Sequence, residues 1–116
     1  MYIGVARSTL DVNVSWRLQS GLFWGIYAAD GDVAIPALAS PRGVSWHQWQ
    51  GQQHYGQGDT LRLLLDSDAG TLTVKKNGNL LGVAVASGLT GPLCWAVSTN
   101  TRNDSVRIKM LDSADF

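Results

Sequence analysis

Apolar and polar residues alternate most regularly between residues 58 and 85 of the chain. Apolar side chains recur at every second position in three consecutive stretches, 61–66, 71–76 and 81–85. In the first stretch the leucines at odd-numbered positions share one face, which is the period of a strand that buries one side. The pattern therefore predicts a meander of three antiparallel strands.

Two turn signals separate these stretches. The segment D-S-D-A-G at 66–70 consists of turn formers and ends on Gly70, which can adopt the positive φ that a short loop often needs. Asn77-Gly78 is the strongest short hairpin signal, because a type I′ turn needs positive φ at both central positions. Both signals predict tight hairpins.

Shorter alternating segments predict further strands at 2–7, 22–28, 33–38, 93–99 and 105–111. Pro36 is expected to place the third of these at a sheet edge, because proline has no N–H to donate to a ladder. The Gln- and Gly-rich stretch 44–58 has no firm period and is interpreted as a loop or a weak strand. Many short strands at this spacing predict an all-β fold, a sandwich of two antiparallel sheets.

The composition agrees with one all-β domain, 1–116. Of the 116 residues 13 are glycine, and all nine acidic residues are aspartate, so good helix formers are scarce. The formal net charge is +0 and the basic residues are scattered, which removes the usual electrostatic basis for binding nucleic acid. No apolar run approaches the roughly 20 residues of a membrane helix, so we expect no membrane partner.

The single cysteine, Cys94, bears on the compartment of the protein. It has no second cysteine to pair with, which fits a reducing environment, and no leader pattern follows Met1. We therefore expect an intracellular, cytoplasmic protein. Because Cys94 lies within an apolar strand, it is expected to be a buried small hydrophobe and not a nucleophile.

Patterns typical of catalysis or metal binding are weak in this chain. A calcium loop starting at Asp66 would lack the glycine at its sixth position and the carboxylate at its twelfth. His47 and His54 have only one distant cysteine to complete a metal site. No nucleophile elbow distinguishes one serine from the others, and the aspartates fall mainly in turns. We expect no enzyme, no cofactor and no metal.

Five motifs, in order, resemble the SPRY (B30.2-type) family. The central one, G-D-T-L-R-L-L-L-D-S-D-A-G-T-L-T-V-K-K-N-G-N-L-L-G at 58–82, is similar to the family's G-D-x-φ-x-φ-x-L-D strand, D-x-G-T-L turn and N-G-x-x-L-G hairpin. The others are Y-I-G-V-A-R at 2–7, W-G-I at 24–26, G-P-L-C-W-A-V-S at 91–98 and V-R-I at 106–108. The resemblance covers almost the whole chain and implies a bent antiparallel β-sandwich of the concanavalin A-like type.

The resemblance also implies that the chain is N-terminally short relative to the family. In SPRY domains one or more strands, including a Y-W-E-V strand, precede the G-V-A strand, and nothing here matches them. Either the chain is a fragment, or another strand, from this chain's end or from a second molecule, covers the edge of 2–7. An uncovered apolar edge invites pairing with a neighbour, which favours a homodimer or strand exchange through it.

SPRY domains are generally interaction modules that capture a peptide or a folded partner through loops at one end of the sandwich. The resemblance places this pocket in the loop after the G-V-A strand, in the loop after A-V-S and in the connection before W-G-I. These residues are Arg7, Ser8, Thr9, Trp16, Thr99, Asn100, Thr101 and Arg102. Arg7 and Arg102 either pair with a carboxylate, favouring an acidic or Asn/Asp-containing partner, or are solvated loop residues.

Five tryptophans in so small a chain need an explanation. Trp24 and Trp95 lie in strands and are expected in the core, although Trp95 stands where the family usually has proline. Trp16, Trp46 and Trp49 lie in connections. They either cover the ends of the core or line a recognition surface.

The sequence thus favours a non-catalytic module that binds a peptide or protein partner. The alternative is a carbohydrate-binding, lectin-like sandwich, because legume-type lectins share the architecture and an exposed tryptophan can stack on a sugar. Such lectins usually hold calcium through an Asp/Asn site, which we do not find. A third reading is a structural segment of a larger protein.

Overall fold

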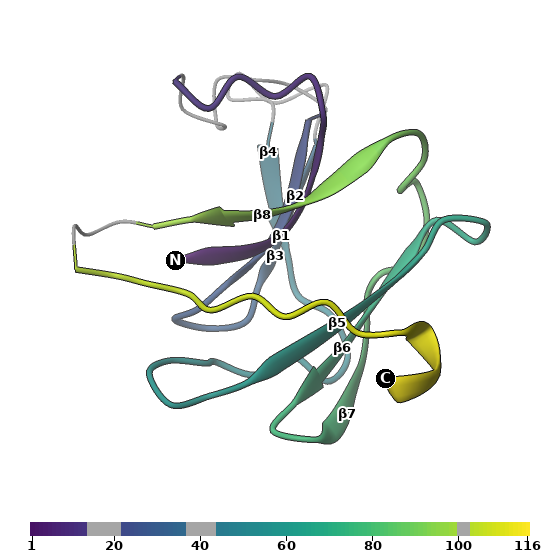
Figure 1. Ribbon diagram of the computed structural model, residues 1–116. Coiled ribbons are helices and arrows are strands. Elements are labelled where there is room, and N and C mark those ends of the chain that lie inside the picture. The colour runs from purple at the N-terminus through teal and green to yellow at the C-terminus, as the bar shows by residue number, and fades with distance from the viewer. Residues whose placement is uncertain (14–21, 37–43, 100–102) are drawn as a thin grey trace.

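The computed structural model describes residues 1–13, 22–36, 44–99 and 103–116. In these ranges the chain forms two antiparallel sheets and one short 3-10 turn near the C-terminus (Figure 1). The elements are β1 (Tyr2–Arg7), β2 (Phe23–Tyr27), β3 (Val33–Pro36), β4 (Val44–His47), β5 (Leu61–Asp66), β6 (Thr71–Lys76), β7 (Asn79–Val85), β8 (Leu93–Ser98) and η2 (Ser113–Asp115). The predicted all-β class with two antiparallel sheets is confirmed.

The larger sheet has the strand order β4-β3-β2-β1-β8, and every adjacent pair is antiparallel. β1 therefore lies inside the sheet, paired with β2 on one side and with β8 on the other. β1 is therefore not an uncovered edge, and of the alternatives left open for it, cover by a later strand of the same chain is the one observed. This removes the basis on which strand exchange through β1 was expected.

The smaller sheet has the order β5-β6-β7, which is the meander that the alternation predicted. The loop between β5 and β6 contains Gly70 at φ 71°, as its turn signal required. In the turn between β6 and β7, φ is 51° at Asn77 and 84° at Gly78. Positive φ at both central positions is typical of a type I′ turn. Both hairpin predictions are confirmed.

Side chains from the two sheets fill the space between them. Val5 and Trp24 of the larger sheet share a buried cluster with Leu72 of the smaller one. A neighbouring cluster joins Ile26 to Val74 in the same way. In the described part of the chain no strand of one sheet pairs with a strand of the other. Burial of apolar surface, and not a ladder of hydrogen bonds, therefore holds the sheets together.

One strand of the larger sheet differs from its prediction, and a second decides between two readings that were left open. β3 lies between β2 and β4, so Pro36 does not mark a sheet edge. The pairing of β3 with β2 covers Val33 and Ala34 only, and Pro36 lies beyond it, where its missing N–H breaks no bond to β2. Val44–His47, in the stretch interpreted as a loop or a weak strand, forms β4.

The strand predicted at 105–111 is not formed. Residues 104–112 have no regular secondary structure and run from the side of β8 toward η2 (Figure 1). Val106, Ile108 and Met110 are exposed along this path. The alternation of side chains is present, but a strand also needs a neighbour with which its backbone can pair.

Candidate binding surface

One face of the larger sheet carries an apolar cluster that does not pack against the smaller sheet. Side chains alternate between the two faces of a strand, so Val5 of β1 points toward the smaller sheet and its neighbours point away. This outer-face cluster has the buried members Tyr2, Ala6, Phe23, Ala34 and Val44, with Leu10, Tyr27 and Ala96 packed against them.

Aromatic side chains dominate the outer-face cluster and fix one another in position. The Tyr2 ring is stacked on Tyr27 with ring centroids 4.8 Å apart, and it meets Phe23 edge-on at 6.5 Å. The indole N–H of Trp46 donates to the Tyr2 hydroxyl over 2.9 Å. Tyr2 thus connects aromatic residues of β2 and β4 across the outer face.

A row of small residues crosses the sheet beside these rings. The register places Trp46 opposite Ala34, Ala34 opposite Gly25, and Gly25 opposite Gly4. A β-carbon at Gly25 would lie 2.4 Å from Cε1 of Phe23, so the Phe23 ring occupies the space that a side chain would fill. The glycine of W-G-I therefore has a packing role on this face.

Trp46 is the aromatic residue of this group that a partner can reach most readily. Tyr2 and Phe23 are each 3% exposed, whereas Trp46 is 37% exposed. Tyr27 is half-buried. Of the two readings left open for Trp46, its position on the outer face of an edge strand favours the recognition surface.

The turn after β1 brings Ser8 and Thr9 to the end of the same face. The N–H of Leu10 donates to the Arg7 carbonyl over 3.0 Å, which closes the turn. Leu10 packs against the outer-face cluster, and Ser8 and Thr9 are exposed. Two hydroxyl groups therefore stand at the end of an aromatic surface, where each can donate and accept hydrogen bonds.

Arg7 makes contacts within the chain. Its guanidinium lies over the Trp24 ring, 5.3 Å from the centroid, and Nη1 donates to the carbonyl of Thr90. The side chain is half-buried and links β1 to the loop before β8. These contacts give Arg7 a structural role, which is neither of the two roles considered for it from the sequence.

The two predicted pocket loops lie at opposite ends of the β1–β8 ladder. Arg7 pairs with Leu93 at the start of β8, while Tyr2 pairs with Ser98, the residue before Thr99. Five residue steps of about 3.3 Å separate the ends, or roughly 17 Å. The structure therefore does not bring Thr99 together with the Arg7–Thr9 loop. The remaining predicted pocket residues, Trp16, Asn100, Thr101 and Arg102, lie outside the described residues.

Trp49 belongs to the core between the sheets. It packs against both inter-sheet clusters, so of the two roles considered for it, the one in the core applies. Its indole N–H donates to the Gly31 carbonyl over 2.7 Å. Trp24 and Trp95 also pack in the inter-sheet core, as expected. Among the tryptophans that the structure describes, Trp46 is thus the one that faces outward.

Cys94 is exposed on the outer face, and its prediction as a buried residue is wrong. Its thiol donates to the Ala6 carbonyl over 3.5 Å on the neighbouring strand. The alternation along β8 explains the outcome, since Leu93 and Trp95 take the inward positions on either side of it. An apolar strand at the edge of a sheet still has an outward face.

Groups with catalytic potential are sparse in the described ranges. No cluster of three or more His, Cys, Asp or Glu residues there is suited to a metal ion. Ser45 Oγ and His47 Nε2 lie 2.7 Å apart on β4. Among the described residues no carboxylate forms a hydrogen bond with the His47 imidazole, as a Ser-His-Asp arrangement would need. Burial raises the pKa of Tyr55, and the hydrogen bond from Asn77 lowers the pKa of Asp59. Neither of these two belongs to the outer-face cluster.

Comparison with family models, curated proteins and solved structures finds no match for the chain. The resemblance to SPRY domains therefore rests on the five sequence motifs. Among the described residues, no helix has the length and apolar character needed to cross a membrane.

Proposed function

We propose that the chain is a non-catalytic interaction module of the SPRY type that binds a peptide or protein partner on its outer face. The observation that carries the proposal is the exposed indole of Trp46, set in an aromatic cluster that the packing of the two sheets does not require. Exposed, well-supported aromatic residues are typical anchors of binding surfaces.

The support beneath Trp46 favours binding. Its hydrogen bond to Tyr2 and the packing of Tyr2 on Tyr27 hold the indole before any partner arrives. A preorganised side chain loses little rotamer freedom on association, so more of the contact energy contributes to affinity. Ser8 and Thr9 add polar groups at the end of the face. The partner segment therefore combines an apolar or aromatic side chain, placed on Trp46, with a polar residue.

A random peptide display library and a glycan array, both applied to the purified chain, test this proposal. We expect peptides to be selected, and we expect Trp46→Ala to weaken them at least tenfold while Trp46→Phe, which keeps a ring, weakens them less. Leu80→Ala is the matched control, since Leu80 is 63% exposed on β7 of the other sheet. Peptides that bind Trp46→Ala as well as the native chain would refute the site.

The glycan array addresses the lectin-like alternative. The same exposed indole is a surface on which a sugar ring can stack, and this is the observation that favours it. If the chain binds glycans through Trp46 and selects no peptides, carbohydrate binding would replace peptide binding as the proposed function. A cytoplasmic location belongs to the main proposal, because Cys94 is exposed without a second cysteine and suits a reducing compartment.

A further inference from the structure

The segment 105–111 has the side-chain pattern of a β-strand but lacks strand hydrogen bonds. Three apolar residues alternate with two basic ones in the order Val106, Arg107, Ile108, Lys109 and Met110. In the described part of the chain no backbone–backbone hydrogen bond involves this segment. Its N–H and C=O groups are thus available to a strand that presents matching groups.

The apolar row of the segment is exposed. Val106 is 39% exposed, Ile108 59% and Met110 69%. Single exposed apolar residues are common, but a row of them along one side of an unpaired extended segment is typical of an interaction site.

The chain beyond the segment is fastened to the smaller sheet. Arg62 of β5 donates from Nη1 to the carbonyl of Asp115 over 3.2 Å. Lys75 of β6 donates from Nζ to the main-chain oxygen of Phe116, and Nζ lies 4.5 Å from the centroid of the Phe116 ring. The segment therefore spans from the β8 side of the molecule to the smaller sheet (Figure 1), which limits the freedom that a partner must remove.

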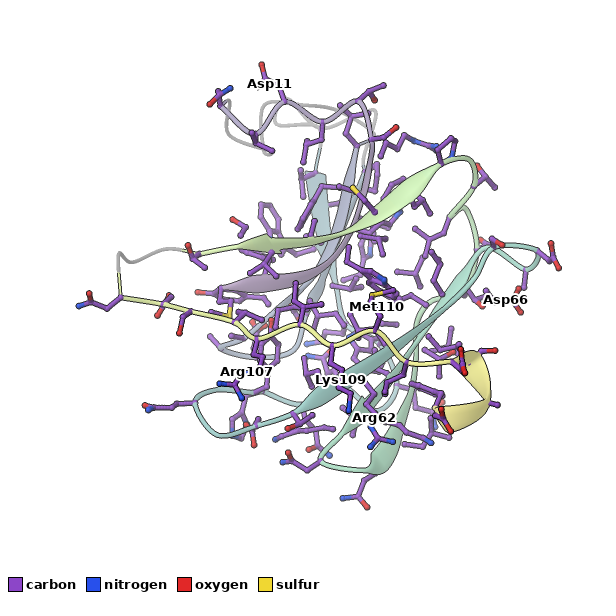
Figure 2. The ribbon with its side chains drawn as sticks, in the orientation of Figure 1. Asp11, Arg62, Asp66, Arg107, Lys109 and Met110 are labelled. Atoms are coloured by element: carbon purple, nitrogen blue, oxygen red, sulfur yellow. The ribbon has the colours of Figure 1, made fainter. Side chains whose placement is uncertain are left out.

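The charges on the segment select the partner. Arg107 and Lys109 are the charged residues between Asp104 and Asp112. Figure 2 shows both extending to the side on which Arg62 lies, while Met110 extends to the other side. Among the described residues neither cation makes an ion pair or a side-chain hydrogen bond. Both are therefore open to acidic groups.

We propose that segment 105–111 binds an extended partner segment of alternating apolar and acidic residues as an added β-strand. Apolar partner side chains cover the exposed row, and acidic ones pair with Arg107 and Lys109 across the new ladder. A second copy of this chain fits less well. Antiparallel self-pairing centred on Ile108 places Arg107 opposite Lys109, and like charges in that position are destabilising. The site is separate from the outer-face cluster and does not depend on the proposed function.

Two synthetic peptides of about seven residues test the proposal, one alternating Val with Glu and the other alternating Val with Lys. We expect the native chain to prefer the Glu peptide about tenfold in a titration, with slowed amide exchange at 105–111 when it is bound. The double variant Arg107→Glu, Lys109→Glu should reverse this preference. Ile108→Pro should abolish binding without loss of stability, because that N–H makes no backbone bond in the folded chain.

Trp46→Ala serves as the control for the other surface and should leave Glu-peptide binding unchanged. Equal affinity for both peptides, or binding that survives Ile108→Pro, would overturn the added strand. Self-association of the native chain that Ile108→Pro abolishes would show a second copy as the occupant and overturn the acidic partner. If the peptide-library test of the outer face failed, the proposal for segment 105–111 would not be affected.

Discussion

At the level of single residues, Asn77 shows why the hairpin signal works. Its positive φ forms the turn, and its side chain also binds the loop before β5. Asn77 Oδ1 accepts from the Thr60 N–H over 2.9 Å, and Nδ2 donates to Asp59 Oδ1 over 2.9 Å. The sequence pattern predicts the turn, but it does not predict the contacts to residues 17 and 18 positions away.

Gly78→Ala isolates the backbone part of this turn. Gly78 has φ 84° and nothing within 4 Å of an added β-carbon, so the cost is conformational and not steric. We expect a loss of about 1 kcal/mol in the free energy of unfolding, measured by urea denaturation. Gly56→Ala is the matched control, because Gly56 has the same open space and no positive φ. Equal effects of the two substitutions would contradict a φ requirement at Gly78.

Tyr55 makes the stability of the fold depend on pH in the alkaline range. It is 7% exposed, its hydroxyl donates to the Ile26 carbonyl, and burial raises its pKa above the ordinary value of 10.0. Below pH 10 the phenol is neutral in both the folded and the unfolded chain. Above pH 10 the unfolded chain releases the proton first, so the contribution of Tyr55 to stability falls as pH rises.

Tyr55→Phe should therefore cost about 1 kcal/mol near pH 8, the typical value of one hydrogen bond, and less near pH 10.5. Urea denaturation of both proteins at the two pH values measures this difference. Tyr2 and Tyr27 are common to both proteins and cancel in the comparison. A difference that stays constant across the two pH values would show that Tyr55 ionises alike in the folded and unfolded states.

At the level of elements, the local alternation of apolar and polar residues was enough to locate most strands. Which strands pair with each other could not be predicted locally, because it depends on the whole chain. The meander β5–β7 was predictable because its partners are consecutive and its turns carry specific signals. The interior positions of β1 and β3 were not, since β8 and β4 reach them from later in the sequence. Segment 105–111 shows the converse case, a strand pattern without a pairing partner in the described chain.

The candidate site was predictable only in part, for the same reason. Trp46 and Trp49 lie in a stretch without a firm period, so the sequence could not assign their faces. The register of β4 with β3 puts Trp46 opposite Ala34 on the outer face, and the turn that follows returns Trp49 to the core. Register also separates Arg7, the last residue of β1, from Thr99, which follows β8, although the two strands are paired.

The turn at 49–52 shows how an irregular element is tied to a sheet. Gln52 donates to the Asp32 carboxylate over 2.9 Å, and the turn lies against β7. A β-carbon at Gly51 would be 1.8 Å from the Leu81 carbonyl oxygen, whereas one at Gly88, with a similar φ, would meet nothing within 4 Å. Close approach to β7 thus requires glycine at position 51.

Gly51→Ala should consequently cost about 3 kcal/mol or more, because the backbone of the turn must move away from β7. Gly88→Ala should cost only about 1 kcal/mol, the conformational part that the two positions share. Thermal and urea denaturation of the two variants give the comparison. If Gly51→Ala were no worse than Gly88→Ala, the contact between the turn and β7 would not contribute to stability.

At the level of the whole molecule, the two sheets are held together by packing between their side chains. Leu72 of β6 is 0% exposed and shares its cluster with Val5 and Trp24 of the larger sheet. Within the described residues no ladder crosses between the sheets. Neither sheet buries its apolar face without the other, so we expect them to unfold as one cooperative unit.

The tryptophans make this expectation measurable, because none of the five lies between residues 61 and 85, the range of the smaller sheet. Leu72→Ala removes buried contacts from the smaller sheet and should lower the free energy of unfolding by about 2–5 kcal/mol. If the sheets are coupled, tryptophan fluorescence must report this loss at the same urea midpoint as far-UV circular dichroism. Leu80→Ala, at a 63% exposed position of β7, should change the free energy of unfolding from either signal by no more than about 0.5 kcal/mol.

A fluorescence midpoint that did not respond to Leu72→Ala would mean that the larger sheet keeps its structure after the smaller one has unfolded. The outer-face cluster would then be stable without the inter-sheet core.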